Sequence, residues 1–192
     1  MNNADESRDV FSTAVPEIER SYLLDRLPEL PAGAEVWRIE QGYLPELLPG
    51  DRGSVDPLEG RVRRVIMPDE TVVFTHTIKR GEGLVREELE RSMTETEFSR
   101  HWPRTESRRL SKTRHRVRVG EVIWEIDDFD QLDIVLAEVE LTDVDMKVEI
   151  PDWLVSHIVR EVTDEPEFRN YELALRARKE LGEGGRAGSG GF

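Results

Sequence analysis

The sequence predicts a mainly β protein of the α+β class, an eight-stranded antiparallel closed β-barrel with a charged interior and a few helices packed outside. Two observations favour this architecture. Short segments in which β-branched or aromatic residues alternate with polar ones recur along the chain. Several joints between these segments are short and turn-like, such as Gly81 to Gly83 and the corner at Gly120, and short joints connect antiparallel neighbours. An antiparallel sheet of about eight strands can close into a tunnel.

The alternating segments give the expected strands in order. They lie at 16–24, 36–43, 60–67, 71–80, 84–91, 110–119, 121–129 and 133–142. Between the second and third strands, residues 45–60 carry three Pro and three Gly. These residues favour turns, so we expect a loop there.

Two helices are expected outside the strands. Thr94 with Glu97 three residues later matches a capping box, and Pro103 ends the helix that it opens. A second helix is expected from about Asp164, with Pro166 in its first turn. A shorter turn is expected at 152–158.

Composition bounds the domain organisation and the setting. The chain of 192 residues is 37% hydrophobic, which suits one domain at 15–181, with a flexible leader at 1–14 and a disordered Gly-rich tail at 182–192. It contains no Cys and no apolar run of the roughly 18 residues that a membrane span needs. We expect a cytoplasmic protein without a membrane partner, either a monomer or a homodimer.

The net charge of −14 disfavours a broad nucleic-acid-binding surface, because such surfaces need a basic excess. A localised basic pocket is still allowed. No nucleic-acid partner is therefore expected.

Charged residues follow the strand periodicity, in which residues of equal parity share one face of the sheet. Carboxylates recur two residues apart on three expected strands, at Glu17 and Glu19, at Glu125 and Asp127, and at Glu138 and Glu140. Cations have matched parity on other strands: Arg61 and Arg63, Lys79, and Lys112, Arg114, Arg116 and Arg118. One strand mixes both signs, with Arg86, Glu88 and Glu90.

Two interpretations of this pattern compete. A sheet with one solvated face also carries charge at two-residue spacing. Closure of the sheet would instead bring like charges to about 4 Å, where they repel by roughly 4 kcal/mol at an effective dielectric of about 20, so the carboxylates would need a cation. Oxygen ligands suit Mg²⁺ or Mn²⁺, and the basic faces suit phosphate. This second interpretation predicts a metal and polyphosphate site.

The ordered series of short motifs resembles the CYTH superfamily, the triphosphate tunnel metalloenzymes. The resemblance covers nearly all of the expected domain, and its specificity lies in the order of the motifs. They are EIERSYLL from 17, IEQGYL from 39, RVRR from 61, THTIK from 75, REELE from 86, LSKTRH from 110, WEIDDF from 124, LAEVEL from 136, PDW from 151, EVTD from 161 and FRNYELA from 168.

The resemblance implies a role for each matching position. The family's metal ligands map to Glu17, Glu19, Asp127, Glu138 and Glu140. Its triphosphate-binding residues map to Arg61, Arg63, Lys79, Arg86, Lys112 and Arg114. Catalytic roles are expected for Glu17, Glu19, Lys79 and Arg114, and Glu88 and Glu90 are possible additional members.

One position departs from the family. The opening motif of the family ends in lysine, whereas this chain has Ser21, and a neutral hydroxyl cannot hold phosphate as an ammonium does. Arg116 or Arg118 could substitute for it. The expected activity is metal-dependent hydrolysis of a linear triphosphate, foremost inorganic tripolyphosphate. The alternatives are a polyphosphate- or nucleotide-binding module without turnover, or adenylyl cyclase or thiamine triphosphatase activity.

Overall fold

The computed structural model describes residues 15–45, 59–80 and 84–184. The expected leader at 1–14, most of the expected loop at 45–60, and the expected tail beyond Gly184 lie outside the described residues. Within the described residues, no helix is long and apolar enough to cross a membrane.

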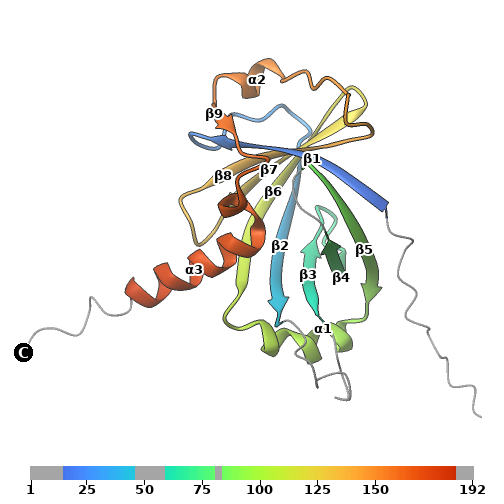
Figure 1. Ribbon diagram of the computed structural model, residues 1–192, viewed down its shortest axis with the longest axis vertical. Coiled ribbons are helices and arrows are strands. Elements are labelled where there is room, and N and C mark those ends of the chain that lie inside the picture. The colour runs from blue at the N-terminus through green and yellow to red at the C-terminus, as the bar shows by residue number, and fades with distance from the viewer. Residues whose placement is uncertain (1–14, 46–58, 81–83, 185–192) are drawn as a thin grey trace, which may run out of the picture.

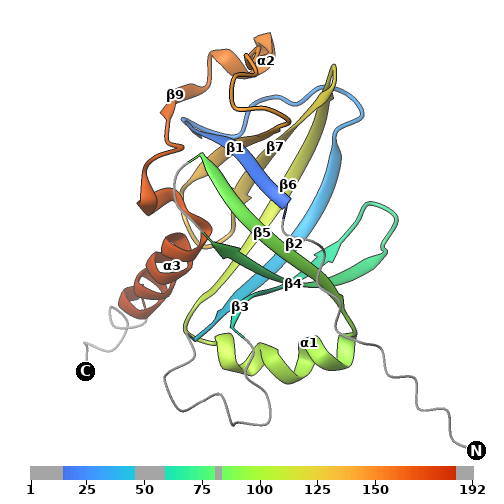
Figure 2. The ribbon, with the colours of Figure 1, turned by 45° about the vertical axis from the view of Figure 1, so that its right-hand side comes forward.

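Eight antiparallel strands close into a barrel, as expected (Figures 1 and 2). In chain order these are β1 Val15–Leu24, β2 Glu35–Leu44, β3 Gly60–Ile66, β4 Val72–Arg80, β5 Val85–Met93, β6 Arg109–Val119, β7 Val122–Phe129 and β8 Val135–Leu141. Their order around the barrel is β5-β4-β3-β2-β6-β7-β8-β1, and β1 pairs again with β5. All eight strand predictions are confirmed, with bounds that differ by one or two residues.

Strand β1 is shared between two neighbours on one edge. Residues 15–18 pair with β5, so that Glu17 lies opposite Arg86. Residues 22–24 pair with a ninth strand, β9 (Ile158–Glu161). The sequence analysis did not predict β9, because four residues are too few for an alternating pattern to stand out.

The helices lie outside the barrel. The predicted capping box is present at Thr94 and Glu97 and opens α1 (Glu95–His101), which continues into a 3₁₀ turn, η2 (Trp102–Thr105). Figures 1 and 2 show α1 across one end of the barrel and α2 (Asp152–Val155) at the opposite end.

The prediction for the last helix was wrong at its start. Pro166 begins only a short 3₁₀ turn, η3 (Pro166–Phe168), because Arg169 is extended with ψ of 138°. The helix α3 (Asn170–Gly184) follows, so it also includes the first three residues of the expected tail.

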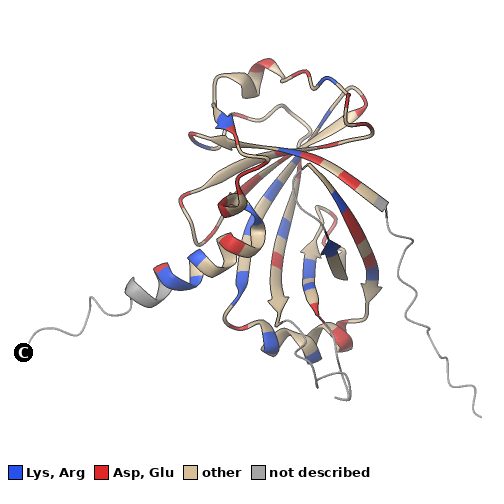
Figure 3. Cartoon of the chain, in the orientation of Figure 1, with Lys and Arg blue, Asp and Glu red and all other residues tan. Residues whose placement is uncertain are grey.

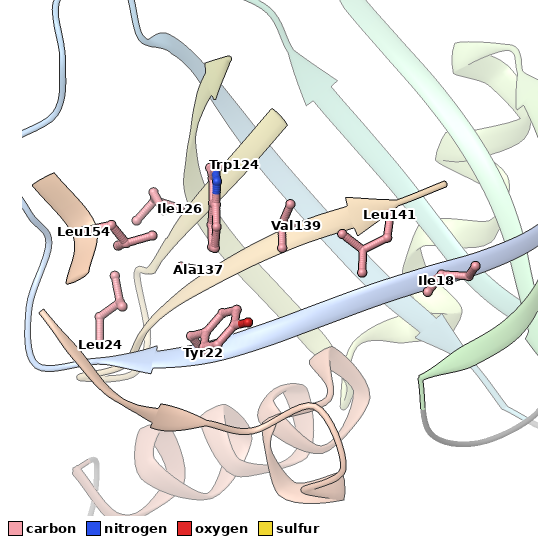
Figure 4. Close-up of a cluster of buried hydrophobic side chains, with 9 residues drawn as sticks. All are labelled: Ile18, Tyr22, Leu24, Trp124, Ile126, Ala137, Val139, Leu141 and Leu154. Carbon is pink, nitrogen blue, oxygen red and sulfur yellow. The ribbon is translucent and has the colours of Figure 1, made fainter. Parts of the chain in front are cut away.

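Apolar side chains pack on both faces of the wall. On the outer face, Tyr22, Trp124 and Val139 pack with Leu154 of α2 (Figure 4). A second cluster joins interior positions of β6, β7 and β8 to α3 through Leu173, Ala174 and Ala177. The interior that remains between these apolar regions is polar, and it contains the candidate site.

Candidate active site

The interior of the barrel contains a cavity of about 970 Å³. Side chains from all eight barrel strands line it, together with residues that precede β6 and residues that lead into α3. Figure 3 shows that Lys, Arg, Asp and Glu alternate with uncharged residues along these strands. The parity argument therefore identified an enclosed charged face, and the solvated-face interpretation does not describe this barrel.

The acidic side of the cavity is formed by β1, β7 and β8. The register places Glu19 opposite Glu140, and Glu138 between Ser21 and Glu125. Like charges directly opposite one another are destabilising. Burial, and then the charges of Glu19 and Asp127, raise the pKa of Glu138 to about 8. Burial and Glu17 also raise the pKa of Glu140.

Most of the cations on the opposite side are paired with carboxylates. Lys79 Nζ donates to both oxygens of Glu17 at 2.6 and 2.8 Å and lies 3.0 Å from Glu88. Arg86 lies 3.4 Å from Glu17 and 3.5 Å from Glu19. These contacts hold the long side chains in the cavity, because each end of the contact is fixed on a paired strand.

Arg61 and Arg63 lie on β3 in the same cavity. Arg63 donates to Glu90 at 3.2 Å, and Arg61 donates to Thr77 at 3.3 Å. Burial, and then the charge of Arg61, lower the pKa of Arg63 to about 10. A bound anion would relieve this accumulation of positive charge.

Asp127 and Lys112 lie beneath the cavity and do not line it. Asp127 is fully buried and accepts from Lys112 and from Arg114 Nε at 2.7 Å. Although burial opposes it, the charges of Arg114 and Lys112 hold the pKa of Asp127 well below its usual range. Arg114 also reaches Glu125 and, at 2.8 Å, Glu138. This network carries Arg114 into the cavity and keeps its head there.

Most of the expected site residues come together. Those that line the cavity are Glu17, Glu19, Ser21, Arg61, Arg63, Lys79, Arg86, Glu88, Arg114, Glu138 and Glu140. Asp127 and Lys112 are buried below it, and Glu90 lies behind Arg63. Arg116 lines the cavity, where its guanidinium packs 4.2 Å from the Trp37 ring centroid, whereas Arg118 is exposed and does not line it.

Sequence reasoning missed four lining residues: Trp37, Tyr43, Arg108 and Arg169. A signal existed for Arg108, because it continues the parity of Lys112 and Arg114 to just before β6. Tyr43 shares the parity of Trp37 on β2, but uncharged residues were not considered as interior groups. Burial raises the pKa of Tyr43 to about 12, so its hydroxyl remains protonated and can donate.

The donor chemistry of the acidic side fits a divalent cation. Glu140 has no ion pair among the described residues, and it faces Glu19 across the ladder. Oxygen-only carboxylate groups suit Mg²⁺ or Mn²⁺. In the described ranges, no three His, Asp or Glu side chains converge as a preformed ligand set, because Glu17 and Glu19 are turned towards Lys79 and Arg86.

Comparison with known proteins identifies the family. No family model matches the chain. The chain is 31% identical over 164 residues to the inorganic triphosphatase of Nitrosomonas europaea, and the match covers 83% of this chain and 97% of that protein. The chain belongs to the inorganic triphosphatase family. Membership of this family agrees with the predicted CYTH resemblance.

Two further comparisons support membership of the inorganic triphosphatase family. The inorganic triphosphatase of Acetivibrio thermocellus is 33% identical over 76 residues, which are 38% of this chain and 46% of that protein. The crystal structure of an inorganic triphosphatase matches with a TM-score of 0.54 and 27% identity, covering 83% of this chain and 94% of the other.

Proposed function

We propose that this protein hydrolyses inorganic tripolyphosphate, releasing the terminal phosphate, with Mg²⁺ or Mn²⁺ as cofactor. The observation that carries the proposal is the meeting of an acidic wall and a basic wall in one enclosed cavity. Triphosphatases of this family generally depend on a metal. A neutral or one-signed cavity would not suit a polyanion together with its metal.

The roles of the residues follow from their positions. Glu17, Glu19, Glu138 and Glu140 would hold the metal, which would neutralise charge on the transferred group and help to activate water. Arg61, Arg63, Lys79, Arg86 and Arg114 would bind the phosphates, since guanidinium groups contact phosphate oxygens in pairs. Asp127 and Lys112 would orient Arg114 from below.

The chemical step needs no covalent intermediate. Water oxygen attacks the terminal phosphorus, the bond to the bridging oxygen breaks, and pyrophosphate and phosphate leave with one proton released. Catalysis of such transfers is mainly positioning and charge stabilisation. The cations of β3, β4 and β6 would supply both by holding the phosphates in line.

Phosphate release from tripolyphosphate with Mg²⁺ or Mn²⁺ tests the proposal. We expect the wild type to turn over and the Glu138→Gln/Glu140→Gln variant to lose at least about 100-fold in kcat, since one removed electrostatic contact commonly costs that much. The control variant Glu172→Gln/Glu180→Gln removes two exposed carboxylates from α3 and should keep full activity. A wild type that releases no more phosphate than the Glu138/Glu140 variant sinks the proposal.

Ser21 favours one second candidate, a tunnel that binds polyphosphate without turnover. Its hydroxyl donates to Glu19 at 3.4 Å and brings no positive charge to Glu138, its partner across the ladder. Tight binding of tripolyphosphate by calorimetry, beside no measurable phosphate release, would identify this function instead.

A further inference from the structure

The cations of the cavity differ in whether a carboxylate neutralises them. Ion pairs with Glu side chains occupy Arg63, Lys79, Arg86, Arg114 and Arg116. A positive charge that already has a carboxylate partner attracts a second anion less strongly, because the pair is nearly neutral at a distance. The places where an additional anion would gain most are therefore the unpaired cations.

Three cavity-lining arginines have no ion pair among the described residues: Arg61, Arg108 and Arg169. The Nε atoms of Arg61 and Arg108 are also buried without a hydrogen-bond partner in that part of the chain. Buried N–H groups without an acceptor are costly. An anion with several oxygens would satisfy both the charge and the N–H groups.

These three arginines come together around Tyr43. Arg61 is the partner of Tyr43 across the β2–β3 ladder, and the Tyr43 amide donates to the Arg108 carbonyl at 3.0 Å. Arg169 lies two residues before Tyr171, whose ring contacts the Tyr43 ring edge-on with a centroid distance of 5.2 Å. Strand β3, the turn before β6 and the start of α3 thus converge on one end of the cavity.

This end is far from the acidic wall. Glu138 contacts Arg114 at 2.8 Å, and Arg114 is six residues along the chain from Arg108, which corresponds to roughly 20 Å at about 3.3 Å per strand residue. Long arginine side chains shorten the gap between their charged heads. Even so, a chain of three phosphates with its terminal group at the carboxylates would leave Arg108 and Arg169 without a partner.

We propose that Arg108 and Arg169 form a distal anion subsite for the fourth and later phosphates of a linear inorganic polyphosphate. This inference deepens the proposed function and rests on it for the placement of the first three phosphates. Arg61 lies between the two regions and contacts the third phosphate. The cavity then selects for chain length, since each phosphate beyond the third gains unpaired cations.

Calorimetric titration with tripolyphosphate and with tetrapolyphosphate tests the subsite. Chelator present throughout removes divalent ions, so that turnover does not disturb the heats. We expect the wild type to bind tetrapolyphosphate about tenfold or more tightly than tripolyphosphate, because a hydrogen bond to a charged group contributes roughly 1.5–3 kcal/mol and 1.4 kcal/mol is a factor of ten. The Arg108→Gln/Arg169→Gln variant should lose this preference and keep its tripolyphosphate affinity within about threefold.

A matched control separates the subsite from total charge. Arg118→Gln/Arg178→Gln also removes two positive charges, but from exposed positions outside the cavity, and it should keep the preference. If the Arg108/Arg169 variant unfolds, Arg108→Lys/Arg169→Lys keeps the charge and should keep part of the preference. Equal affinity of the wild type for both chains overturns the inference. Equal weakening of both chains in the Gln variant, or loss of the preference in the control, overturns it too.

Phosphate release from tripolyphosphate with Mg²⁺ separates this inference from the proposed function. Turnover of tripolyphosphate without a length preference in binding leaves the proposed function intact and removes the subsite. A length preference that depends on Arg108 and Arg169, in a protein that releases no phosphate, supports the subsite and removes the hydrolase.

Discussion

Single residues in this barrel owe their roles to burial as much as to charge. Asp127 shows this most clearly, because it has the parity of a ligand and yet accepts only from Lys112 and Arg114 below the cavity. A carboxylate with two cations already bound has little capacity left for a metal. We therefore assign Asp127 to holding Arg114 in place.

Replacement of Asp127 by Asn should destabilise the fold strongly. The variant would leave Lys112, which is 3% exposed, without its charged partner, and breaking a buried pair by removing one partner costs about 3–5 kcal/mol. Urea unfolding measures the loss. The comparison is Glu161→Gln, which removes one partner of an exposed pair with Arg20 and should cost less than about 1 kcal/mol. Similar small losses in both variants would contradict the structural role.

Ser21→Lys should raise the turnover of tripolyphosphate. The new ammonium would lie beside Glu19 and opposite Glu138, where three or more carboxylates share too little positive charge. We expect kcat to rise by about tenfold, equivalent to about 1.4 kcal/mol of the barrier. Ser21→Met provides a side chain of comparable length without charge and should give no gain. Equal rates in Ser21→Lys and wild type would show that the missing lysine does not limit this protein.

Parity predicted the charged interior residues because alternation is a property of every strand. Tyr43 and Trp37 were missed because an aromatic residue on a strand ordinarily indicates packing, and nothing in one sequence marks it as a cavity wall. Arg169 was missed for a different reason. Its position depends on how the extended residue between η3 and α3 turns, which the sequence does not reveal.

At the scale of elements, turns and strand starts are as constrained as the site. Gly60 opens β3 with φ of 94°, and a Cβ there would lie 2.5 Å from the Thr77 carbonyl oxygen. Backbone atoms of a paired strand cannot move aside without breaking the ladder. Because Arg61 follows immediately, the position of Gly60 also fixes a residue that lines the cavity.

Gly60→Ala should therefore be more harmful than an alanine at another glycine with positive φ. Gly120 has φ of 60°, and nothing lies within 4 Å of a Cβ placed there. Both variants bear backbone strain, but only Gly60→Ala adds a clash, which typically costs about 1–3 kcal/mol more. Thermal and urea unfolding of the two variants check this difference. Equal destabilisation would argue against the close approach of β3 and β4.

The elements themselves were largely predictable. Eight alternating segments and a capping box are local signals, and each gave an element close to the expected bounds. Strand β9 and the late start of α3 were not predictable, because both depend on tertiary contacts. The amide of Val162 donates to the Ser21 carbonyl at 2.8 Å, a contact between residues far apart in sequence.

At the scale of the whole molecule, the acidic wall links stability to pH. Because the folded pKa of Glu138 is raised to about 8 above its ordinary value of 4.5, the folded state binds a proton more tightly than the unfolded state. The resulting stability is fully present below about pH 4.5 and is lost as the pH rises through 8. Buried carboxylates elsewhere in the cavity shift in the same direction.

The melting temperature of the metal-free protein should fall between pH 5 and pH 8.5. The Glu138→Gln variant should show a smaller fall, because its amide cannot ionise. Saturating Mg²⁺ should raise the wild-type melting temperature most at high pH, since a ligand at about 100 times its dissociation constant adds roughly 2.7 kcal/mol. A metal-free wild type that grows more stable over this range, or that ignores Mg²⁺, would contradict the convergence of the carboxylates.

Closure of the barrel depends on a short stretch near the beginning of the chain. Only residues 15–18 of β1 pair with β5, before β9 takes the same edge. Amide protons along this junction should exchange with deuterium earlier than those of β2 and β6, which pair over eight residues. For anyone producing the protein, the practical corollary is to attach purification handles and fusion partners after the last helix, leaving the opening strand unencumbered.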